Sequence, residues 1–429
     1  MQCNQQVISF WLYCFLLFAM HGQQPTFSKD SLYISEEYHS KIDSIITRGI
    51  KNKAFPGATI LVAKNGVIKY HKTFGFHTYD SVLPVTYDAL YDLASITKIL
   101  GPLPALMKLV EEKKINLDEP FSNYWKPWRN RKNKKTLTLR QILAHQAGLA
   151  PYIVFLNTVR KKNGTLKKRY VRIKPSNKFQ KQVYEGLYAN NKFERKVFRH
   201  INRSQVSPEK KYTYSGLAFL IFPKLIEQLT GKTYETYLQK NFYTPIGANT
   251  LGYNPKSKKL PNSIIPTEID TIFRHTRTQG WVHDENAALL GGVSGNAGLF
   301  GTATDVFKMM QLYQNFGEFD GQKILNQSTV KEFTHIQYET NKNRRGLGFD
   351  KPLIGNDTLA LSKAYPAPKA SASSFGHAGF TGTFVWADPE YRMVFIFLTN
   401  RVYPYRDHRK LYELNIRPTL HQLFYEIIN

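Results

Sequence analysis

Ser95 and Lys98 stand three positions apart in the apolar stretch YDLASITKIL, and this pair of residue types can perform acyl chemistry. If a helix begins near Ser95, residues i and i+3 lie on one face about 5–6 Å apart, so hydroxyl and amine can meet. Serine needs a neighbour that takes its proton, and burial among apolar side chains favours the neutral amine that a lysine base requires. Unpaired N–H groups at a helix start also favour negative charge nearby. The pattern therefore predicts an activated serine nucleophile.

The S-x-x-K spacing is weak evidence by itself, because a chain of this length contains about two matches by chance. Two further matches are present, SPEK at 207–210 in a polar turn and STVK at 328–331 in the predicted first turn of an exposed helix. The alternative for Ser95 is a helix-capping serine beside a lysine whose stem lies along apolar surface. Of the three matches, only that of Ser95 lies inside apolar sequence, so the remaining segments have to decide.

The composition indicates a folded protein, built as one large domain or as two lobes. The 429 residues are 42% hydrophobic and 21% charged, which is unlike a disordered chain. Much of the formal charge of +27 lies between residues 160 and 211, where lysine and arginine recur against three glutamates. Because no helix-turn-helix, zinc-finger or RNA-binding signature accompanies this segment, we predict a solvated basic insertion at about 157–207 and no nucleic-acid partner. Attraction to an anionic envelope surface is the alternative role of this charge.

An apolar run of about 14 residues at 7–20 has the length of a signal-peptide core and is too short to span a membrane. We expect cleavage after Gly22, which gives a signal peptide at 1–22, a mature domain at 23–429 and a secreted or periplasmic location. The preceding MQCNQQ lacks basic residues, so a retained N-terminal membrane anchor is the alternative. Both cysteines, Cys3 and Cys14, lie in this leader. The mature chain would therefore have no disulfide, thiolate metal site or cysteine nucleophile.

Predicted strands at both ends of the chain enclose a mainly helical middle. We expect helices at 36–53, 103–112, 137–149, 217–229, 303–316 and 418–428, and strands at 57–77, 373–379, 381–388 and 392–400. Asn65-Gly66 suits a type I′ hairpin turn, and Pro102 and Pro104 imply a bend or restart after the Ser95 turn. The prediction is an α/β (α+β) fold, in which an antiparallel sheet from both termini is flanked by helices and carries an inserted all-α lobe. A catalytic cleft would lie between the lobes.

Two downstream segments supply groups that the first segment lacks. KYTYSGLAF at 211–219 places Tyr214 before a helix, and FGHAGFTGT at 375–383 places His377 and Gly379 at the end of a strand. In the order and spacing of these segments, the chain resembles the serine β-lactamase and penicillin-binding protein superfamily, in its class C β-lactamase-like and serine D-peptidase branch. That branch has S-x-x-K near the start, Y-x-N about a hundred residues later and K/H-x-G near the C-terminus. The resemblance covers roughly residues 42–428 and includes LTLRQILAHQAGL and HDENAALLGGVSGNAGLFGTATD.

The resemblance implies a β-lactamase/transpeptidase-like fold and a role for each motif residue. Ser95 would form the acyl-enzyme, Lys98 would be its buried base, and Tyr214 would relay the proton to the leaving group. The residues implied for substrate binding are Ser215, His377, Gly379 and Phe380, with the backbone N–H groups of Ser95 and Phe380 as the oxyanion hole. Acyl transfer needs a nucleophile, a base and such donors in any case. No cofactor is implied, and adjacent His283 and Asp284 do not make a metal site.

Two positions depart from the pattern of that branch. Gly216 stands where the branch usually has Asn, so the side-chain amide that would bond Lys98 and the substrate amide is absent. His377 stands where many members have lysine, and an unperturbed imidazole is mostly neutral at pH 7. Recognition of a substrate carboxylate should be weaker as a result. These changes favour an esterase, amidase or D-aminopeptidase-like peptidase over an efficient β-lactamase.

The combined reasoning predicts an exported serine hydrolase that acylates Ser95 on an ester, amide or D-amino-acid peptide. Cell-wall-derived D-amino-acid peptides are the leading substrate class. The alternative is a catalytically lapsed protein of the same fold that binds peptidoglycan fragments or a partner. Gly216 and His377 are the residues that motivate this alternative.

Overall fold

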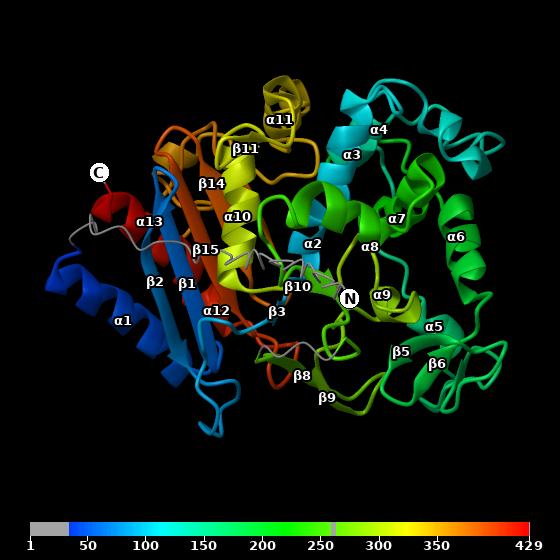
Figure 1. Cartoon of the computed structure of the whole chain (residues 1–429), viewed down its shortest axis with the longest axis horizontal. Coiled ribbons are helices and arrows are strands. Elements are labelled where there is room, and N and C mark those ends of the chain that lie inside the picture. The colour runs from blue at the N-terminus through cyan, green and yellow to red at the C-terminus, as the bar shows by residue number, and fades with distance from the viewer. Residues whose placement is uncertain (1–33, 259–262, 429) are drawn as a thin grey trace, which may run out of the picture.

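The computed structural model describes residues 34–258 and 263–428, so the predicted leader at 1–22 lies outside the described residues. A sheet with helices on both faces lies beside a larger, mainly helical region, and the C-terminal helix lies close to the sheet (Figure 1). Within the described ranges, none of the helices is both long and apolar enough to cross a membrane.

Both ends of the chain build the five-stranded antiparallel sheet, whose strand order is β13-β14-β15-β1-β2. Its strands are β1 Gly57–Lys64, β2 Val67–Gly75, β13 Phe375–Ala378, β14 Phe384–Asp388 and β15 Met393–Thr399. N-terminal β1 pairs with C-terminal β15, with Ala58 opposite Thr399. Asn65 and Gly66 have φ of 54° and 80°, as a type I′ turn requires. The predicted sheet from both termini is confirmed.

Helices cover both faces of this sheet, which explains why β1 and β15 are buried along almost their whole length. On one face, Ile60 and Val62 of β1 join a core cluster with α1 (Glu36–Lys51) and α13 (Ile416–Ile427). On the other face, Leu61 and Ala63 join the main core with α10 (Ala303–Gln314). Figure 1 shows α1 and α13 on one side of the sheet and α10 on the other. Alternate residues of β1 therefore pack against the helices on opposite faces of the sheet.

The region between the two halves of the sheet is mainly helical. Its helices are α2 Thr97–Leu100, α3 Pro102–Glu111, α4 Leu139–Leu143, α5 Leu156–Val159, α6 Phe193–Arg203, α7 Leu217–Thr230, α8 Tyr234–Leu238, α9 Glu285–Leu289 and α11 Gln327–Thr334, and α12 Lys410–Glu413 follows β15. The restart after the Ser95 turn occurs as expected, since α3 begins at Pro102. The fold class is confirmed.

Short strands add to the helices of this region, where the sequence predicted helices alone. They are β3 Tyr91–Asp92, β10 Leu299–Gly301 and β7 Gly252–Tyr253 in one sheet, β4 Val171–Arg172, β6 Leu187–Ala189 and β5 Lys181–Tyr184 in a second, and the pairs β8 Pro266–Asp270 with β9 Thr276–Gln279 and β11 Glu318–Phe319 with β12 Gln322–Lys323. Strands of two to five residues are too short for an alternating pattern to be recognised in the sequence.

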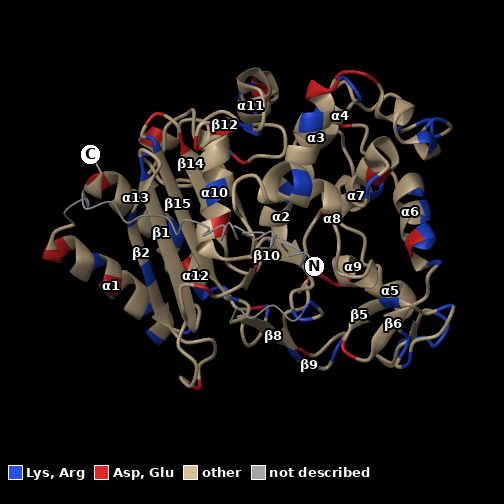
Figure 2. Cartoon of the chain, in the orientation of Figure 1, with Lys and Arg blue, Asp and Glu red and all other residues tan. Residues whose placement is uncertain are grey.

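The basic insertion is a folded part of this region and holds α5, β4, β5, β6 and α6. The apolar face of α6 buries Phe193, Val197 and Ile201. Asn202 of the same helix accepts hydrogen bonds of 2.9 Å from the indole N–H groups of Trp125 and Trp128. Lysine and arginine residues, coloured blue, mark α6 and the loops beside β5 and β6 (Figure 2). The insertion therefore packs through its apolar residues and carries its charge on the outer side.

Candidate active site

Ser95 and Lys98 meet at the start of α2, as the sequence predicts. Ser95 lies in a 3₁₀ turn, Ala94–Ile96, that leads directly into α2. Lys98 is 2% exposed, and its Nζ lies 2.9 Å from Ser95 Oγ and donates a 2.8 Å hydrogen bond to the backbone O of Asn296. The lysines of the two other S-x-x-K matches, Lys210 and Lys331, are exposed. The sequence context therefore separated the buried pair from its two decoys.

The turn before Ser95 is fixed from several sides. Ala94 has a positive φ of 45°, which costs energy for a residue with a side chain. Buried Asp92 accepts hydrogen bonds from the N–H of Ala94 at 2.9 Å and of His283 at 2.6 Å, and Thr381 donates to the Asp92 carbonyl at 2.8 Å. Burial raises the pKa of the Asp92 carboxyl despite these donors. The strained turn is held by contacts to two remote segments.

The third motif packs directly against this turn, at the end of β13. A methyl group on Gly379 would stand 2.1 Å from Thr383 Oγ1 and 2.7 Å from the Leu93 carbonyl O. Only glycine permits that approach. The next residue, Phe380, is 48% exposed; its ring centroid lies 5.5 Å from that of His283, and its carbonyl accepts a 2.9 Å hydrogen bond from Arg401. Gly379 thus packs against the Ser95 segment.

We expect Gly379→Ala to lower the rate of Ser95 acylation about 100-fold while the protein stays folded, because a displacement of about 1 Å near the reacting atoms has effects of that size. Stopped-flow labelling with a fluorophosphonate measures the rate, and circular dichroism checks the fold. Gly252→Ala is the matched control, since its added methyl meets nothing within 4 Å and should change neither reading. Wild-type labelling kinetics in Gly379→Ala would contradict the expectation.

Four nitrogen-bearing side chains surround the ring of Tyr214. Lys98 Nζ lies 5.3 Å from the ring centroid and Arg345 Cζ 5.7 Å, and the ring centroids of His145 and His377 lie at 4.6 and 6.0 Å. The first, second and third motifs thus converge on Tyr214. The buried guanidinium of Arg345 places a positive charge beside this ring.

His377 is neutral at pH 7, because burial, reinforced by the charges of Arg345 and Lys98, lowers its pKa to about 3. Its Nδ1 lies 2.8 Å from the Ala378 carbonyl O, and its buried Nε2 has no hydrogen-bond partner within the described ranges. Burial likewise lowers the pKa of His145 well below its ordinary value, with Arg345 and Lys98 as the next causes. The neutral third-motif imidazole predicted from the sequence agrees with this geometry.

Arg345 is a site residue that the sequence did not reveal. Its guanidinium is buried, lies 3.2 Å from Asp350 Oδ1 and donates a 2.9 Å hydrogen bond to the Gly348 carbonyl. Asp350 also exchanges backbone hydrogen bonds with Gly376 of β13, at 2.8 and 3.0 Å. The loop that carries Arg345 is therefore attached to the strand of the third motif. The Arg345 guanidinium places a positive charge in the region of His377, which is itself neutral.

Ser215 has a structural position, in contrast to its predicted substrate contact. Its hydroxyl donates a 2.6 Å hydrogen bond to the Ala150 carbonyl and accepts one of 3.3 Å from Leu217 N–H at the start of α7. Its backbone N–H donates to His145 Nδ1 at 3.2 Å, and the residue is 4% exposed. Because the hydroxyl is occupied within the protein, the structure favours a role in orienting Tyr214 for this residue.

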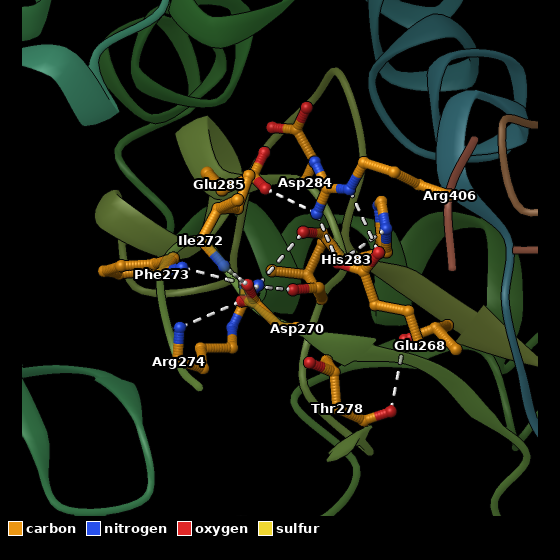
Figure 3. Close-up of polar contacts among 12 residues, drawn as sticks. Glu268, Asp270, Ile272, Phe273, Arg274, Thr278, His283, Asp284, Glu285 and Arg406 are labelled. Atoms are coloured by element: carbon orange, nitrogen blue, oxygen red, sulfur yellow. Dashed lines mark hydrogen bonds and ion pairs between the residues drawn. The ribbon is translucent and has the colours of Figure 1, made fainter. Parts of the chain in front are cut away.

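A buried network of charges supports the segment that holds Asp92 (Figure 3). His283 Nε2 lies 3.1 Å from Glu268 Oε1, and Arg406 bridges Glu268 and Glu285. Arg274 belongs to the same network: it pairs with Asp270 at 3.0 Å and donates to the carbonyls of Val282 and His283. Partners in such a network are costly to remove one at a time. Its five charged side chains and His283 fix the His283 backbone N–H that reaches Asp92.

The described ranges hold no group of three or more His, Cys, Asp or Glu side chains arranged for a metal ion. His283 and Asp284 have separate tasks instead. His283 contacts Glu268, while Asp284 caps α9 by accepting a 2.8 Å hydrogen bond from Ala287 N–H.

The sheet of both termini, the helical region and the Ser95–Lys98 pair define a protein of the β-lactamase and penicillin-binding protein fold. The model of the β-lactamase family matches residues 42–417, and the chain belongs to that family. An Escherichia coli K12 protein named "Putative D-alanyl-D-alanine carboxypeptidase" is 30% identical over 381 residues, which are 83% of this chain and 81% of that protein. The chain is therefore a member of the serine hydrolase superfamily that includes such proteins.

Solved structures of low sequence identity share the fold. A penicillin-binding protein homologue from Caulobacter crescentus superposes with a TM-score of 0.61 at 17% identity, over 92% of this chain and 98% of that one. EstCE1, described as a hydrolase with promiscuous acyltransferase activity, superposes with a TM-score of 0.60 at 16% identity, over 89% and 97% of the two chains. These likenesses confirm the architecture.

Proposed function

We propose that this protein is a serine hydrolase that acts through a Ser95 acyl-enzyme on an ester, amide or D-amino-acid peptide, with peptidoglycan-derived peptides as the leading class. The observation that carries the proposal is the buried Lys98 amine, 2.9 Å from Ser95 Oγ, on a turn against which the third motif packs. The name of the Escherichia coli relative supports a peptide substrate with a C-terminal D-residue. The description of EstCE1 supports ester chemistry on the same fold.

In the proposed reaction, Ser95 Oγ attacks the carbonyl carbon of the substrate and passes its proton to the Lys98 amine. The proton moves on through Tyr214 to the leaving group as the bond to that group breaks. A water molecule then attacks the acyl carbon, gives up a proton by the same route and releases Ser95. The N–H groups of Ser95 and Phe380 receive the oxyanion, and the Arg401 contact to the Phe380 carbonyl fixes the peptide group that follows the second donor.

The charge states of His377 and Arg345 affect which substrates the site would prefer. His377 is neutral, and Arg345 is only 1% exposed, so its charge acts on Tyr214 and the bound substrate at a distance. Neither residue offers the exposed ammonium that a third-motif lysine would bring to a carboxylate. This favours esters, amides and N-terminal D-residues over substrates whose binding depends on a free carboxylate.

We further propose that the chain is exported through the segment at 1–22 and acts outside the cytoplasm as residues 23–429. The Escherichia coli relative is named for a reaction on D-alanyl-D-alanine, a cell-wall constituent, which supports that location. The exposed basic insertion at about 157–207 would hold the protein near anionic envelope polymers.

Intact-mass spectrometry after incubation with a panel of β-lactams, p-nitrophenyl esters and D-Ala-D-Ala peptides tests the proposal. The wild type should gain the mass of one acyl group with at least one compound, and release of p-nitrophenol or D-alanine reports turnover. Ser95→Ala should show no adduct, whereas Ser328→Ala, from an exposed S-x-x-K match, should behave as the wild type.

The absence of any adduct and any turnover across the panel would overturn the proposal. Tight binding of muropeptides that is unaffected by Ser95→Ala, together with that absence, would favour the lapsed binding protein. A salt titration that finds no binding of DNA or RNA at low ionic strength checks the expectation of no nucleic-acid partner.

A further inference from the structure

Arg401 is a buried cation that lacks a carboxylate partner within the described ranges. The residue is 3% exposed and lies just after β15. Its guanidinium donates hydrogen bonds to the backbone carbonyls of Phe380 at 2.9 Å, Arg406 at 3.2 Å and His408 at 2.6 Å. A buried charge is normally paired, because burial removes its hydration. Among the described residues, the positive charge of Arg401 therefore has no counter-charge at ion-pair distance.

Two further arginines lie beside Arg401, around the ring of Tyr412 in α12. The Cζ atoms of Arg401, Arg409 and Arg417 lie 5.2, 5.9 and 5.0 Å from the centroid of that ring, and we call these four residues the Tyr412 cluster. In the described part of the chain, the arginines that form ion pairs are Arg140, Arg274, Arg344, Arg345 and Arg406. Because arginine stays charged at pH 7, the cluster holds three positive charges without an ion-pair partner.

The acidic side chains of the same segment do not neutralise the Tyr412 cluster. Glu413 pairs with Lys410 at 3.2 Å. Asp407 is exposed and takes part in none of the ion pairs within 34–258 and 263–428. Neither carboxylate therefore lies at ion-pair distance from a guanidinium of the cluster.

The three arginines repel one another, as the pKa of Arg401 shows. Burial lowers this pKa, the neighbouring Tyr412 raises it, and the charges of Arg417 and Arg409 lower it further. Arg417 Nη1 is also buried and has no hydrogen-bond partner among the described residues. A charged donor without an acceptor is costly for the folded protein. An anion bound at the cluster would supply the missing electrostatic partner.

A phosphate group fits this charge better than a carboxylate does. It carries up to about two negative charges near neutral pH, whereas a carboxylate carries one. The planar guanidinium of arginine also bonds two phosphate oxygens at once. Arg409 is exposed and Tyr412 is 37% exposed, so a ligand reaches the cluster from solvent. Charge and access together favour a phosphate group.

The Tyr412 cluster adjoins the third motif. Arg401 Cζ lies 4.6 Å from the centroid of the Phe380 ring, and the Arg401 backbone N–H donates a 2.8 Å hydrogen bond to the Thr381 carbonyl. Phe380 follows Gly379 directly and is 48% exposed. A phosphate group at the cluster would therefore lie beside the candidate active site, without contact to Ser95 or Lys98.

We propose that Arg401, Arg409 and Arg417 form, around Tyr412, a binding site for a phosphate group that belongs to a lipid headgroup or to a soluble phosphate compound. The site does not depend on the proposed acyl-enzyme function. It is also separate from the basic insertion, whose charge lies on α6 and the loops beside β5 and β6.

Isothermal titration calorimetry with inorganic phosphate, at an ionic strength held constant with sodium chloride, tests the proposal. The wild type should bind one phosphate per chain with a saturable isotherm. Arg409→Gln should weaken this binding at least 10-fold, because it removes one of the three charges, and acetate should bind the wild type at least 10-fold more weakly than phosphate. In phosphate-free buffer, Arg409→Gln should melt at or above the wild-type temperature, since it relieves repulsion. An arginine with a merely structural role would not show that increase.

Arg199→Gln is the matched control, because it removes one exposed positive charge from α6 in the basic insertion. It should bind inorganic phosphate as the wild type does. Phosphatidylglycerol vesicles distinguish the two sources of the phosphate group. A greater loss of vesicle binding in Arg409→Gln than in Arg199→Gln assigns the site to a lipid headgroup, and equal losses assign it to a soluble phosphate compound.

The proposal is overturned if the wild type shows no saturable phosphate binding, if Arg409→Gln and Arg199→Gln bind phosphate alike, or if acetate binds as tightly as phosphate. Both substituted side chains are exposed, so both variants should fold. Ser95→Ala should bind phosphate as the wild type does, because the cluster does not include Ser95. A failure of the proposed acyl-enzyme function therefore leaves this test unaffected.

Discussion

Lys98→Met is expected to lower the rate of Ser95 acylation about 10³-fold, since general-base transfer contributes about 10²- to 10⁴-fold. Methionine has a similar length and no charge, and Lys98 is 2% exposed among apolar residues, so the fold should persist. The substitution removes the amine that lies 2.9 Å from Ser95 Oγ. Single-turnover acylation by a p-nitrophenyl ester and by a β-lactam, followed by intact mass, measures the loss.

Lys331→Met provides the matched control, because it makes the same chemical change in the exposed S-x-x-K match of α11. Its acylation rate should equal that of the wild type. Acylation of Lys98→Met within threefold of the wild-type rate, with the fold intact, would show that another group takes the Ser95 proton. Tyr214 would then be the first group to substitute.

Acidification from pH 7 to 4.5 is expected to lower the free energy of unfolding by several kcal/mol, because histidines that are buried and neutral in the folded protein bind protons in the unfolded chain. Burial lowers the pKa of both His377 and His421 to about 3. Between about pH 6.5 and 3 the unfolded chain binds these protons and the folded chain does not, so stability falls as the pH falls through that window. Each histidine contributes about 2–3 kcal/mol of this loss at pH 4.5, a large share of the 5–15 kcal/mol typical of a domain.

His421→Phe isolates one of these contributions. The His421 ring is fully buried, has no hydrogen-bond partner at either nitrogen within the described ranges, and stacks 4.7 Å from the ring centroid of Phe395. A phenylalanine suits that site and does not titrate. Urea denaturation at pH 7 and 4.5 should show that the variant loses about 2–3 kcal/mol less than the wild type. The comparison at pH 7 gives the pH-independent packing effect, and equal losses in both proteins would refute the explanation.

Local sequence determined the parts of this protein whose interactions are local. Ser95 and Lys98 meet because residues i and i+3 share a helical face, and the chain turns at Asn65-Gly66 because these residues accept positive φ. The restart at Pro102 follows from the fixed φ and missing N–H of proline. The order of the three motifs then predicted which segments would converge, and the packing of Gly379 on the Ser95 turn agrees with that expectation.

Tertiary structure alone decided which groups complete the site. Arg345, Asn296 and the His283 network come from segments far from Ser95 in the chain, and nothing in their own spacing marks them. Ser215 shows the reverse case: its place in a motif suggested a substrate contact, but packing turned its hydroxyl to Ala150. Which side chain faces a cleft depends on how remote elements pack, because burial and hydrogen-bond partners are set by the whole fold. The sequence thus predicted the Ser95–Lys98 pair, and the fold decided which groups surround it.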